Sequence, residues 1–516
     1  MQKILWADDE IEILQAHVLF LREKGYIVKT VTNGDDAVYE VKHNDYDMIL
    51  LDEMMPGKDG LTTLNEIKDL APQLPVIMIT KSEEESLMED AIGKRIDDYL
   101  TKPVNPSQIL MACKKILNSK NIISEKRSQA YTNEIARISM SLMDMSGHED
   151  WIDLAIKISR MDMDIDDTSD NFREILYNQR REVNVEFGKY IEKKYEVWVN
   201  NMRNKDRPLF SVDVIPNYII PRLKSGKQVV FIVIDCLRMD QWFTLEPYFY
   251  DLFRIDKDYY FSILPTATPF SRNAIFSGLF PIEIEKQYPD LWSLNEDDES
   301  LNRYEKELLD LQLQRNGLNL HNDLKYIKIM NRDDMRNFEK NIHNYLDSQM
   351  LAIVINFVDI LAHSRSDLPI LKEIVPDEAA FRSLTSTWYN HSPMIGIMEK
   401  IARSKANVFI TSDHGSIRGL RGSKVIGDRD TSTNLRYKYG RSLKADKKNA
   451  IFIKNPATWK LPNRGINTTY IIAKEDYYFV YPTNYSKYLN YYKDSFQHGG
   501  VSIEEMVLPI VSLENK

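Results

Sequence analysis

Residues 228–238 (QVVFIVIDCLR) decide the fold of the larger part of this chain. β-Branched, aliphatic and aromatic side chains run without interruption from Val229 to Ile234, and the run ends on the carboxylate of Asp235. A run of this kind is typical of a parallel strand buried on both faces of its sheet. The sequence therefore predicts an α/β domain in which Asp235 lies at the carboxyl end of a central strand, where such sheets carry their functional groups.

Further strands are expected downstream, with helix-length sequence between them. They are residues 262–265, 326–330, 352–357, 408–411 and 450–453. This alternation indicates a large doubly wound α/β domain, which we place at residues 208–516.

Aspartate and histidine side chains recur in this domain beside expected strand ends or glycines. They are Asp359 and His363 in NFVDILAHS, Asp413 and His414 in ITSDHGS, and His498 in FQHGG, while the turn-rich segment 264–281 offers Thr268. These groups can hold two divalent ions with a hydroxyl between them. Zinc is favoured over magnesium because imidazole is not a preferred donor to Mg²⁺. The pattern indicates a metal-dependent hydrolase.

Whole-chain properties limit the alternatives. A length of 516 residues predicts two or three domains, and 43% hydrophobic residues with 28% charged residues argues against extensive disorder. A net charge of −10 disfavours general nucleic-acid binding. Only Cys113 and Cys236 are present, and neither a signal peptide nor a membrane-inserting segment is recognised, so a cytoplasmic protein is expected.

Residues 1–119 repeat a strand-then-helix pattern through KILWADD, YIVKTVTN, MILLD, VIMIT and DYLTKP. Five such repeats predict a parallel sheet with helices on both faces. Three of the expected strands end at aspartates or at a threonine, and the fifth is followed by a lysine. These residues are Asp8, Asp9, Asp52, Thr80 and Lys102.

With ADDE, LLDEMMPGKDG, MIT and TKP in this order, the segment resembles a response-regulator receiver domain of flavodoxin-like fold. The resemblance implies that Asp52 accepts a phosphoryl group and that Mg²⁺ is held by Asp8, Asp9, Asp52 and the backbone carbonyl of Met54. It further implies that Thr80 and Lys102 contact the phosphoryl group and that Tyr99 is an aromatic switch. Hard carboxylates suit Mg²⁺, which agrees with this interpretation.

Residues 120–207 contain no proline, and apolar residues recur there at helical spacing. We predict a linker domain of about three helices, which couples the flanking domains or dimerises.

The larger domain resembles the PglZ branch of the alkaline phosphatase superfamily, through PTATPFSRNAIFSGLFP, the DxxxH spacing, DHG and the late HGG. The resemblance implies that Thr268 is the nucleophile of a phosphodiesterase or phosphatase. It implies two zinc ions, one held by Asp235, Asp413, His414 and Thr268, the other by Asp359, His363 and His498.

Two positions depart from phosphodiesterase relatives of this superfamily. Ser271 stands where they tend to carry a phosphate-binding asparagine, and Cys236 follows the first ligand where many carry glycine. The shorter hydroxyl of Ser271 can still donate, so we expect impaired or altered specificity rather than inactivity. A basic stretch after His414, including Arg418, Arg436 and Lys438, is interpreted as a phosphate-clamping loop or as a solvated loop, and Arg238 as a further contact in the same cleft.

The order of receiver, helical linker and PglZ domain closely resembles PorX-type response regulators. That resemblance implies a sensor histidine kinase as phosphodonor, an alternative sigma factor as partner and control of type IX secretion. We expect phosphorylation at Asp52 to drive homodimerisation and to regulate hydrolysis of nucleotides, including short linear or cyclic oligonucleotides. The alternative is an adaptor that binds a sigma factor through a catalytically weak PglZ domain. Direct DNA binding is disfavoured because no helix-turn-helix pattern is recognised.

Overall fold

The computed structural model describes residues 2–516 except 82–95, 166–169, 293–301, 321–322, 368, 429–431, 433, 464 and 466. The chain divides into two compact units, Met1–Glu134 and Ile135–Lys516. Within the described residues, no helix combines the length and the apolar character needed to cross a bilayer.

The first unit is built on a parallel five-stranded sheet in the order β2-β1-β3-β4-β5. Its strands are β1 (Lys3–Ala7), β2 (Ile27–Val31), β3 (Met48–Asp52), β4 (Val76–Thr80) and β5 (Asp98–Thr101), and its helices include α1 (Gln15–Glu23), α2 (Gly34–His43) and α3 (Gly60–Leu70). This strand order is that of flavodoxin-like folds, which confirms the predicted fold class.

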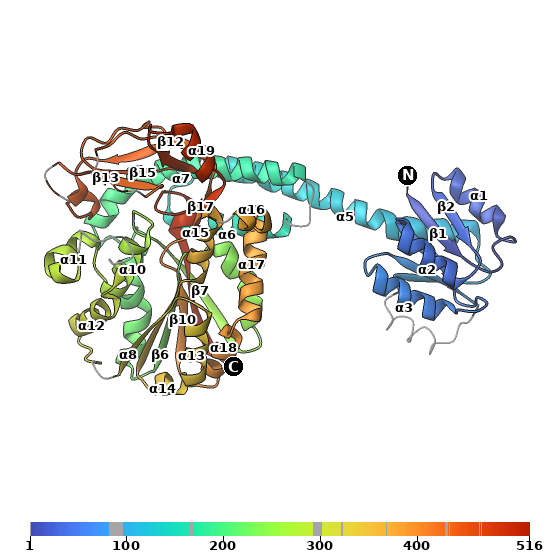
Figure 1. Cartoon of the computed structure of the whole chain (residues 1–516), viewed down its shortest axis with the longest axis horizontal. Coiled ribbons are helices and arrows are strands. Elements are labelled where there is room, and N and C mark those ends of the chain that lie inside the picture. Colours follow the sequence, from blue (N-terminus) through green and yellow to red (C-terminus); the bar gives the residue numbers. More distant parts are fainter. Residues whose placement is uncertain are drawn as a thin grey trace. The chain divides into compact units, whose positions relative to one another are not determined.

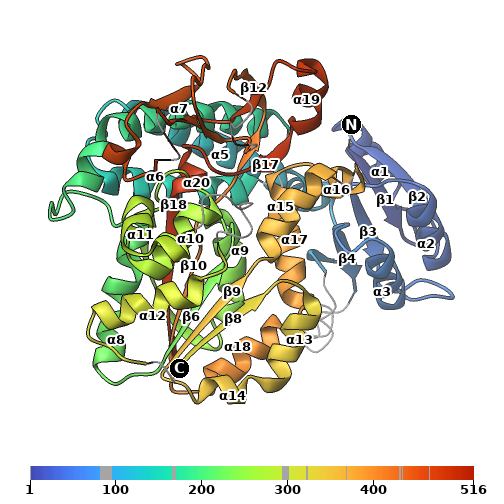
Figure 2. The ribbon, with the colours of Figure 1, turned by 60° about the vertical axis from the view of Figure 1, so that its left-hand side comes forward.

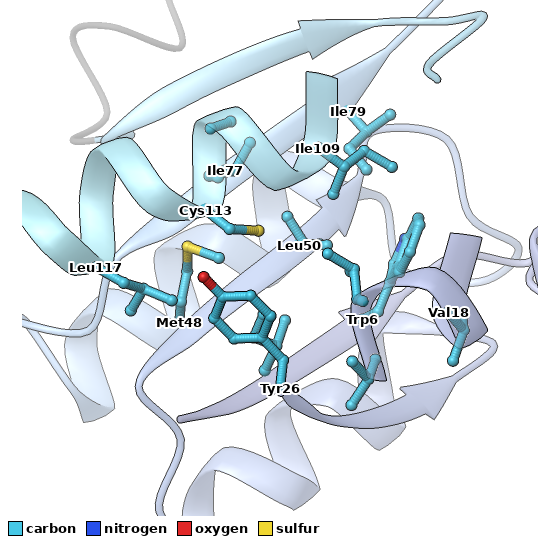
Figure 3. Packing of buried hydrophobic residues seen from close by; sticks show 14 of the residues in the cluster. Trp6, Val18, Tyr26, Met48, Leu50, Ile77, Ile79, Ile109, Cys113 and Leu117 are labelled. Carbon is cyan, nitrogen blue, oxygen red and sulfur yellow. The ribbon is translucent and has the colours of Figure 1, made fainter. Parts of the chain in front are cut away.

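The core of this sheet explains the apolar runs seen in the sequence. On one face, Trp6, Met48, Leu50 and Ile77 are buried against Cys113 at the start of α5 (Pro106–Ser141). Figure 3 shows these side chains packed together between the strands and the helix. Because both faces of the central strands are covered, their residues do not alternate between polar and apolar.

Three long helices occupy the described part of the predicted linker region: α5, α6 (His148–Ile165) and α7 (Asp170–Asn200). The helix that begins against the first sheet is the same α5 that continues to Ser141, so no helix boundary marks position 119. The domain limits at 119 and 207 stay predictions.

The second unit contains a six-stranded sheet in the order β7-β18-β10-β6-β9-β8, with helices on both faces (Figures 1 and 2). Its strands are β6 (Val229–Ile234), β7 (Phe253–Phe261), β8 (Leu324–Ile329), β9 (Met350–Ile355), β10 (Asn407–Thr411) and β18 (Val507–Asn515). β10, β6, β9 and β8 are parallel, whereas β18 is antiparallel to both of its neighbours.

Helices and small strands complete this unit. The helices are α8 (Ile220–Lys224), α9 (Met239–Leu245), α10 (Thr268–Ser277), α11 (Pro281–Gln287), α12 (Glu305–Arg315), α13 (Arg332–Asn341), α14 (His343–Leu346), α15 (Phe357–Asp367), α16 (Pro369–Ile374), α17 (Glu378–His391), α18 (Met394–Ala402), α19 (Tyr485–Tyr492) and α20 (Ile503–Met506). The strands are β11 (Ile417–Gly419), β12 (Arg421–Lys424), β13 (Tyr437–Gly440), β14 (Ala450–Ile453), β15 (Thr469–Ala473), β16 (Tyr477–Val480) and β17 (Ser495–Gln497).

Two predicted strands are placed differently. Residues 262–265 form no strand, because the strand before them, β7, ends at Phe261. Residues 450–453 do form β14, but in a separate three-stranded sheet, β13-β15-β14. β7 is an edge strand in which exposed and half-buried residues alternate, so it lacks the continuous apolar run that marks the central strands.

Gly60 in the PGKDG segment allows α3 to start directly against the end of β3. A Cβ atom added at Gly60 would lie 2.3 Å from the carbonyl oxygen of Asp52 and 2.7 Å from Cα of Glu53, both of which are backbone atoms. We expect Gly60→Ala to lower the free energy of unfolding of the first unit by about 1–3 kcal/mol, because the backbone must move to relieve the overlap. Urea denaturation measures this, with the exposed Thr62→Ala of the same helix as control; equal stabilities would contradict it.

Candidate metal centres and active site

The strand ends of the first unit bring three carboxylates together. Asp8, Asp9 and Asp52 each offer an oxygen atom within 4.8 Å of the others. Nζ of Lys102 lies 2.9 Å from Asp52 and 3.1 Å from Asp8. Burial raises the pKa of Asp52 to about 6, while the hydrogen bond from Lys102 opposes this shift. Hard oxygen donors in this number fit a divalent ion such as Mg²⁺.

Three further predicted residues lie around this cluster. Thr80, at the end of β4, donates a hydrogen bond to the carboxylate of Glu53. Tyr99 on β5 is 39% exposed, and the side chain of Met54 points away from the core with 67% exposure. Their proposed roles as phosphoryl contact, switch and carbonyl ligand stay predictions.

In the second unit, strand ends and one helix start bring Thr268 and three predicted ligands together. Asp235 follows β6, Asp413 and His414 follow β10, and Thr268 begins α10. Thr268 Oγ1 lies 2.9 Å from His414 Nε2 and donates to Asp235 Oδ1 over 3.4 Å. His414 Nε2 is also 3.7 Å from carboxylate oxygens of Asp235 and Asp413. All three predicted ligands are fully buried.

A second cluster lies beside the first. Asp359 and His363 are one turn apart on α15, and His498 follows β17. Nε2 of His363 is 3.0 Å from Nε2 of His498 and 3.3 Å from Asp359 Oδ1. The ring of His498 stacks on that of His414 at 4.2 Å between centroids, which makes the two clusters neighbours.

The chemistry of these groups fits two divalent ions. Among the described residues, Asp413 Oδ2 and Asp359 Oδ1 are buried oxygen atoms that accept no hydrogen bond. Burial and the charge of Asp235 raise the pKa of Asp413 above its usual range. Burial, with the nearby His414, lowers the pKa of His498 well below its usual value, so this imidazole is neutral and able to ligate. Bound cations would offset the free-energy cost of burying these carboxylates in their ionised form.

Arg272 is a functional candidate that the sequence interpretation missed. It lies one turn after Thr268 on α10 and is buried. Its guanidinium donates to Asp235 Oδ2 and to Glu305 Oε1, each over 2.5 Å, and lies 3.9 Å from Asp413. Its four-residue spacing from Thr268 was the available signal, because residues i and i+4 share a helix face.

A cavity of about 440 Å³ opens onto both clusters and is large enough for a small nucleotide-sized ligand. Its lining includes Thr268, His363, His498, Asn356 and Lys328. Asn356 donates to Asp235 Oδ2 over 3.0 Å. Lys328, on β8, is a cavity cation that sequence reasoning did not identify.

Each of the predicted substrate contacts already has partners within the protein. Ser271 is buried, and its Oγ donates toward the carbonyls of Ile263 and Pro265 at 3.5 and 3.4 Å. Arg238 pairs with Asp240, Arg418 with Glu378 and Asp494, and Arg436 with the buried Glu505. Lys438 Nζ donates to the carbonyls of Ser432 and Asn434. These contacts favour structural roles for all five residues.

Cys236 adopts φ +65°, the left-handed region that glycine enters most easily. This backbone conformation directs the amide N–H of Cys236 to Asp413 Oδ1 at 3.3 Å, so the turn after β6 also orients a candidate ligand.

We expect Arg272→Met to lower the free energy of unfolding of the metal-free chain by about 3–5 kcal/mol, because it leaves Asp235 and Glu305 as buried, uncompensated charges. Added zinc should recover part of this loss, since a cation beside Asp235 replaces the missing positive charge. Urea denaturation with and without a chelator measures both effects. An equal deficit in both conditions would contradict this electrostatic role.

Lys438 gives a pH dependence of stability. Burial lowers its pKa to about 7 in the folded protein, whereas the unfolded chain keeps the ordinary value near 10.5. Between these values the unfolded state binds more protons than the folded state. The free-energy cost of burying Lys438 therefore falls, and the stability of the protein rises, as pH increases from 7 toward 10. We expect wild type to gain up to about 1 kcal/mol per pH unit relative to Lys438→Met between pH 7 and 9. Urea denaturation at these pH values tests it; a pH-independent difference would contradict it.

Comparisons with known families agree with this geometry. The family model for the BREX system PglZ alkaline phosphatase-like domain matches residues 214–513, more than half of the 516-residue chain. The response regulator receiver domain model matches residues 4–114, and the PorX response regulator linker domain model matches residues 121–199.

Individual relatives match the N-terminal part. Transcriptional regulatory protein ResD of Bacillus subtilis is 31% identical over 146 residues, and SrrA of Staphylococcus aureus is 26% identical over 146 residues. These matches cover 28% of this chain and 60% of each relative, so the chain spans about 60% of their length.

Solved structures match the same part. A two-component response regulator from Clostridium difficile is 30% identical, and the receiver domain of Francisella response regulator 1452 is 27% identical. Each has a TM-score of 0.23 and covers 23% of this chain and 99% of that chain. From the three family models, the chain belongs to the PglZ family and is a response regulator of the PorX type, with a receiver domain ahead of its PglZ domain.

Proposed function

We propose that the PglZ domain is a zinc-dependent phosphodiesterase that acts on nucleotides, including short linear or cyclic oligonucleotides, under the control of phosphorylation at Asp52. The observation that carries this proposal is the position of Thr268. This residue lines the cavity, and its hydroxyl contacts both His414 and Asp235. A threonine hydroxyl becomes nucleophilic only where a base or a cation stabilises its deprotonated form.

The chain's own residues prepare Thr268 for attack on phosphorus. Its hydroxyl proton is directed to Asp235 Oδ1, and Thr268 is the first residue of the ten-residue helix α10. The helix dipole favours negative charge at Thr268 and on a bound phosphoryl oxygen. Arg272 holds Asp235 in place through its guanidinium.

Two zinc ions, held by Asp235, Asp413 and His414 with Thr268 and by Asp359, His363 and His498, would supply Lewis acidity and an activated water for hydrolysis. The neutral state of His498 suits it to ligation. Neutralisation of the carboxylates would also let an anionic phosphodiester enter a cavity that otherwise carries several acids.

A nucleotide diester is the substrate class that we favour. The cavity of about 440 Å³ exceeds the needs of a simple phosphate monoester, and Lys328 together with asparagine side chains offers donors to phosphate and base. The PglZ match supports phosphoester chemistry in general terms.

The regulatory part of the proposal rests on the receiver domain. Its match supports a phosphodonor such as a sensor histidine kinase acting on Asp52, beside the acidic cluster that suits Mg²⁺. Homodimerisation, an alternative sigma factor as partner and control of type IX secretion complete the proposal. The match to the PorX linker domain model is what supports these parts of the proposal.

We expect Thr268→Ala to lower hydrolysis of bis(p-nitrophenyl) phosphate and of dinucleotides by about 10³-fold or more, because the nucleophile is lost. Thr268→Ser, which keeps a hydroxyl, is the matched control and should retain most of the activity. Steady-state rates of zinc-loaded protein, with chelator-treated samples beside them, measure this. Equal rates for wild type and Thr268→Ala, or no turnover by the zinc-loaded wild type, would instead support the adaptor function.

A further inference from the structure

Helix α7, the last long helix before the PglZ domain, presents one continuous buried face to that domain. Asn184, Phe187, Ile191 and Tyr195 on this face are each at most 3% exposed. Asn184 and Tyr195 are eleven residues apart, which is just over three full turns, so they share a face about 16 Å apart along the axis. In both ribbon views, α7 crosses the end of the six-stranded sheet where β17 lies (Figures 1 and 2).

At one point on this face, Asn184 binds the segment that follows His498. Its Nδ2 donates to Glu504 Oε2 over 3.0 Å, and the backbone N–H of Ile503 donates to its Oδ1 over 2.8 Å. Arg180, one turn earlier, lies 3.5 Å from Glu504 Oε1. The next residue, Glu505, accepts from the backbone N–H of Gly500 at 2.8 Å, which continues the connection toward His498.

At the other point, Tyr195 binds the segment that leads to Thr268. Its hydroxyl oxygen accepts a hydrogen bond from the backbone N–H of Leu264 over 2.9 Å, and both groups are buried. Phe187 packs on Phe261 at the end of β7, with 5.9 Å between ring centroids. The loop before α10 is therefore held against α7 at Leu264, and β7, which leads into this loop, is held at Phe261.

The two segments are also joined to each other by Thr266. Its hydroxyl donates to the carbonyl of Gly500 over 2.8 Å and accepts from the backbone N–H of Gly499 over 3.1 Å. Its carbonyl lies 3.3 Å from Nδ1 of His498. The position of His498 relative to Thr268 thus depends on two loops that share α7 as their common support.

We propose that α7 sets the geometry of the active site, with Asn184 positioning the metal ligand His498 and Tyr195 positioning the loop of the nucleophile Thr268. The proposal rests on the proposed function and adds the route of regulation. α7 lies within the region matched by the linker model, between receiver and PglZ domain in the sequence. A rotation or shift of α7 would move both loops together, so a change transmitted through the linker alters the site without any contact to substrate.

The first test uses Asn184 in the full-length chain. We expect Asn184→Ala to weaken zinc affinity at the site of His498 by about 10–100-fold, as loss of residues that orient metal ligands does elsewhere. In metal-free protein it should also speed amide hydrogen exchange at Ile503. Asn184→Asp places a carboxylate against Glu504 and should likewise weaken zinc affinity and speed exchange at Ile503. Asn184→Asp combined with Glu504→Gln restores a donor–acceptor pair and should recover zinc affinity.

The second test uses Tyr195, with Tyr190 as a matched control on the same helix. Tyr195→Phe removes only the hydroxyl that accepts from Leu264, so we expect kcat to fall at least tenfold with zinc affinity at the site of His498 unchanged. Tyr190 packs on Trp151 and Trp198, and Tyr190→Phe should change neither quantity.

The outcomes separate this inference from the proposed function. Wild-type zinc affinity and amide exchange in Asn184→Ala, with only a lower unfolding temperature, would overturn it and assign Asn184 to stability alone. Failure of the double variant to recover affinity would also count against it. If zinc-loaded wild type hydrolyses no phosphodiester, the proposed function fails, yet zinc affinity and amide exchange still decide whether α7 positions His498.

Discussion

The second unit depends on one electrostatic constraint: two carboxylates, Asp235 and Asp413, are fully buried at the ends of adjacent parallel strands. Like charges in such a place are costly unless cations or hydrogen-bond donors meet them. Arg272 meets one side of Asp235, and Asp413 Oδ2 is left without a hydrogen bond. The fold thus places buried acidic groups where Thr268 and His414 also converge, and a divalent cation would suit this group of side chains.

The first unit resolves a similar conflict in a different way. Asp8 and Asp52 are buried together at strand ends, but Lys102 contacts both of them. The ammonium of a lysine is a point charge on a flexible stem, so Lys102 could move to a phosphoryl group on Asp52, whereas the planar guanidinium of Arg272 makes two short bonds of fixed geometry. The first arrangement would suit the proposed phosphorylation site, and the second holds Asp235 in place.

Much of this arrangement could be predicted from the sequence because buried parallel strands have an unambiguous pattern. The run before Asp235 and the spacing between Asp359 and His363 carry enough information to place ligands at one edge of a sheet. β7 could not be placed in the same way, since an edge strand with polar alternation resembles loop sequence. The burial of Arg436 and Lys438 could not be predicted either, because a cluster of basic residues has the same sequence whether its charges face solvent or are paired inside the protein. The partner of Arg436 is Glu505, which is distant in the sequence.

The same limit applies to α7. Its sequence shows apolar residues at helical spacing, which predicts a packed face but not what that face supports. Asn184 and Tyr195 add polar groups to this face, and buried polar groups persist only where each finds a partner. Their partners are Ile503, Glu504 and Leu264, in the two segments that carry His498 and Thr268. Because these bonds are directional, a shift of α7 along its axis breaks them rather than stretching them, which makes the helix a discrete control element and not a passive spacer.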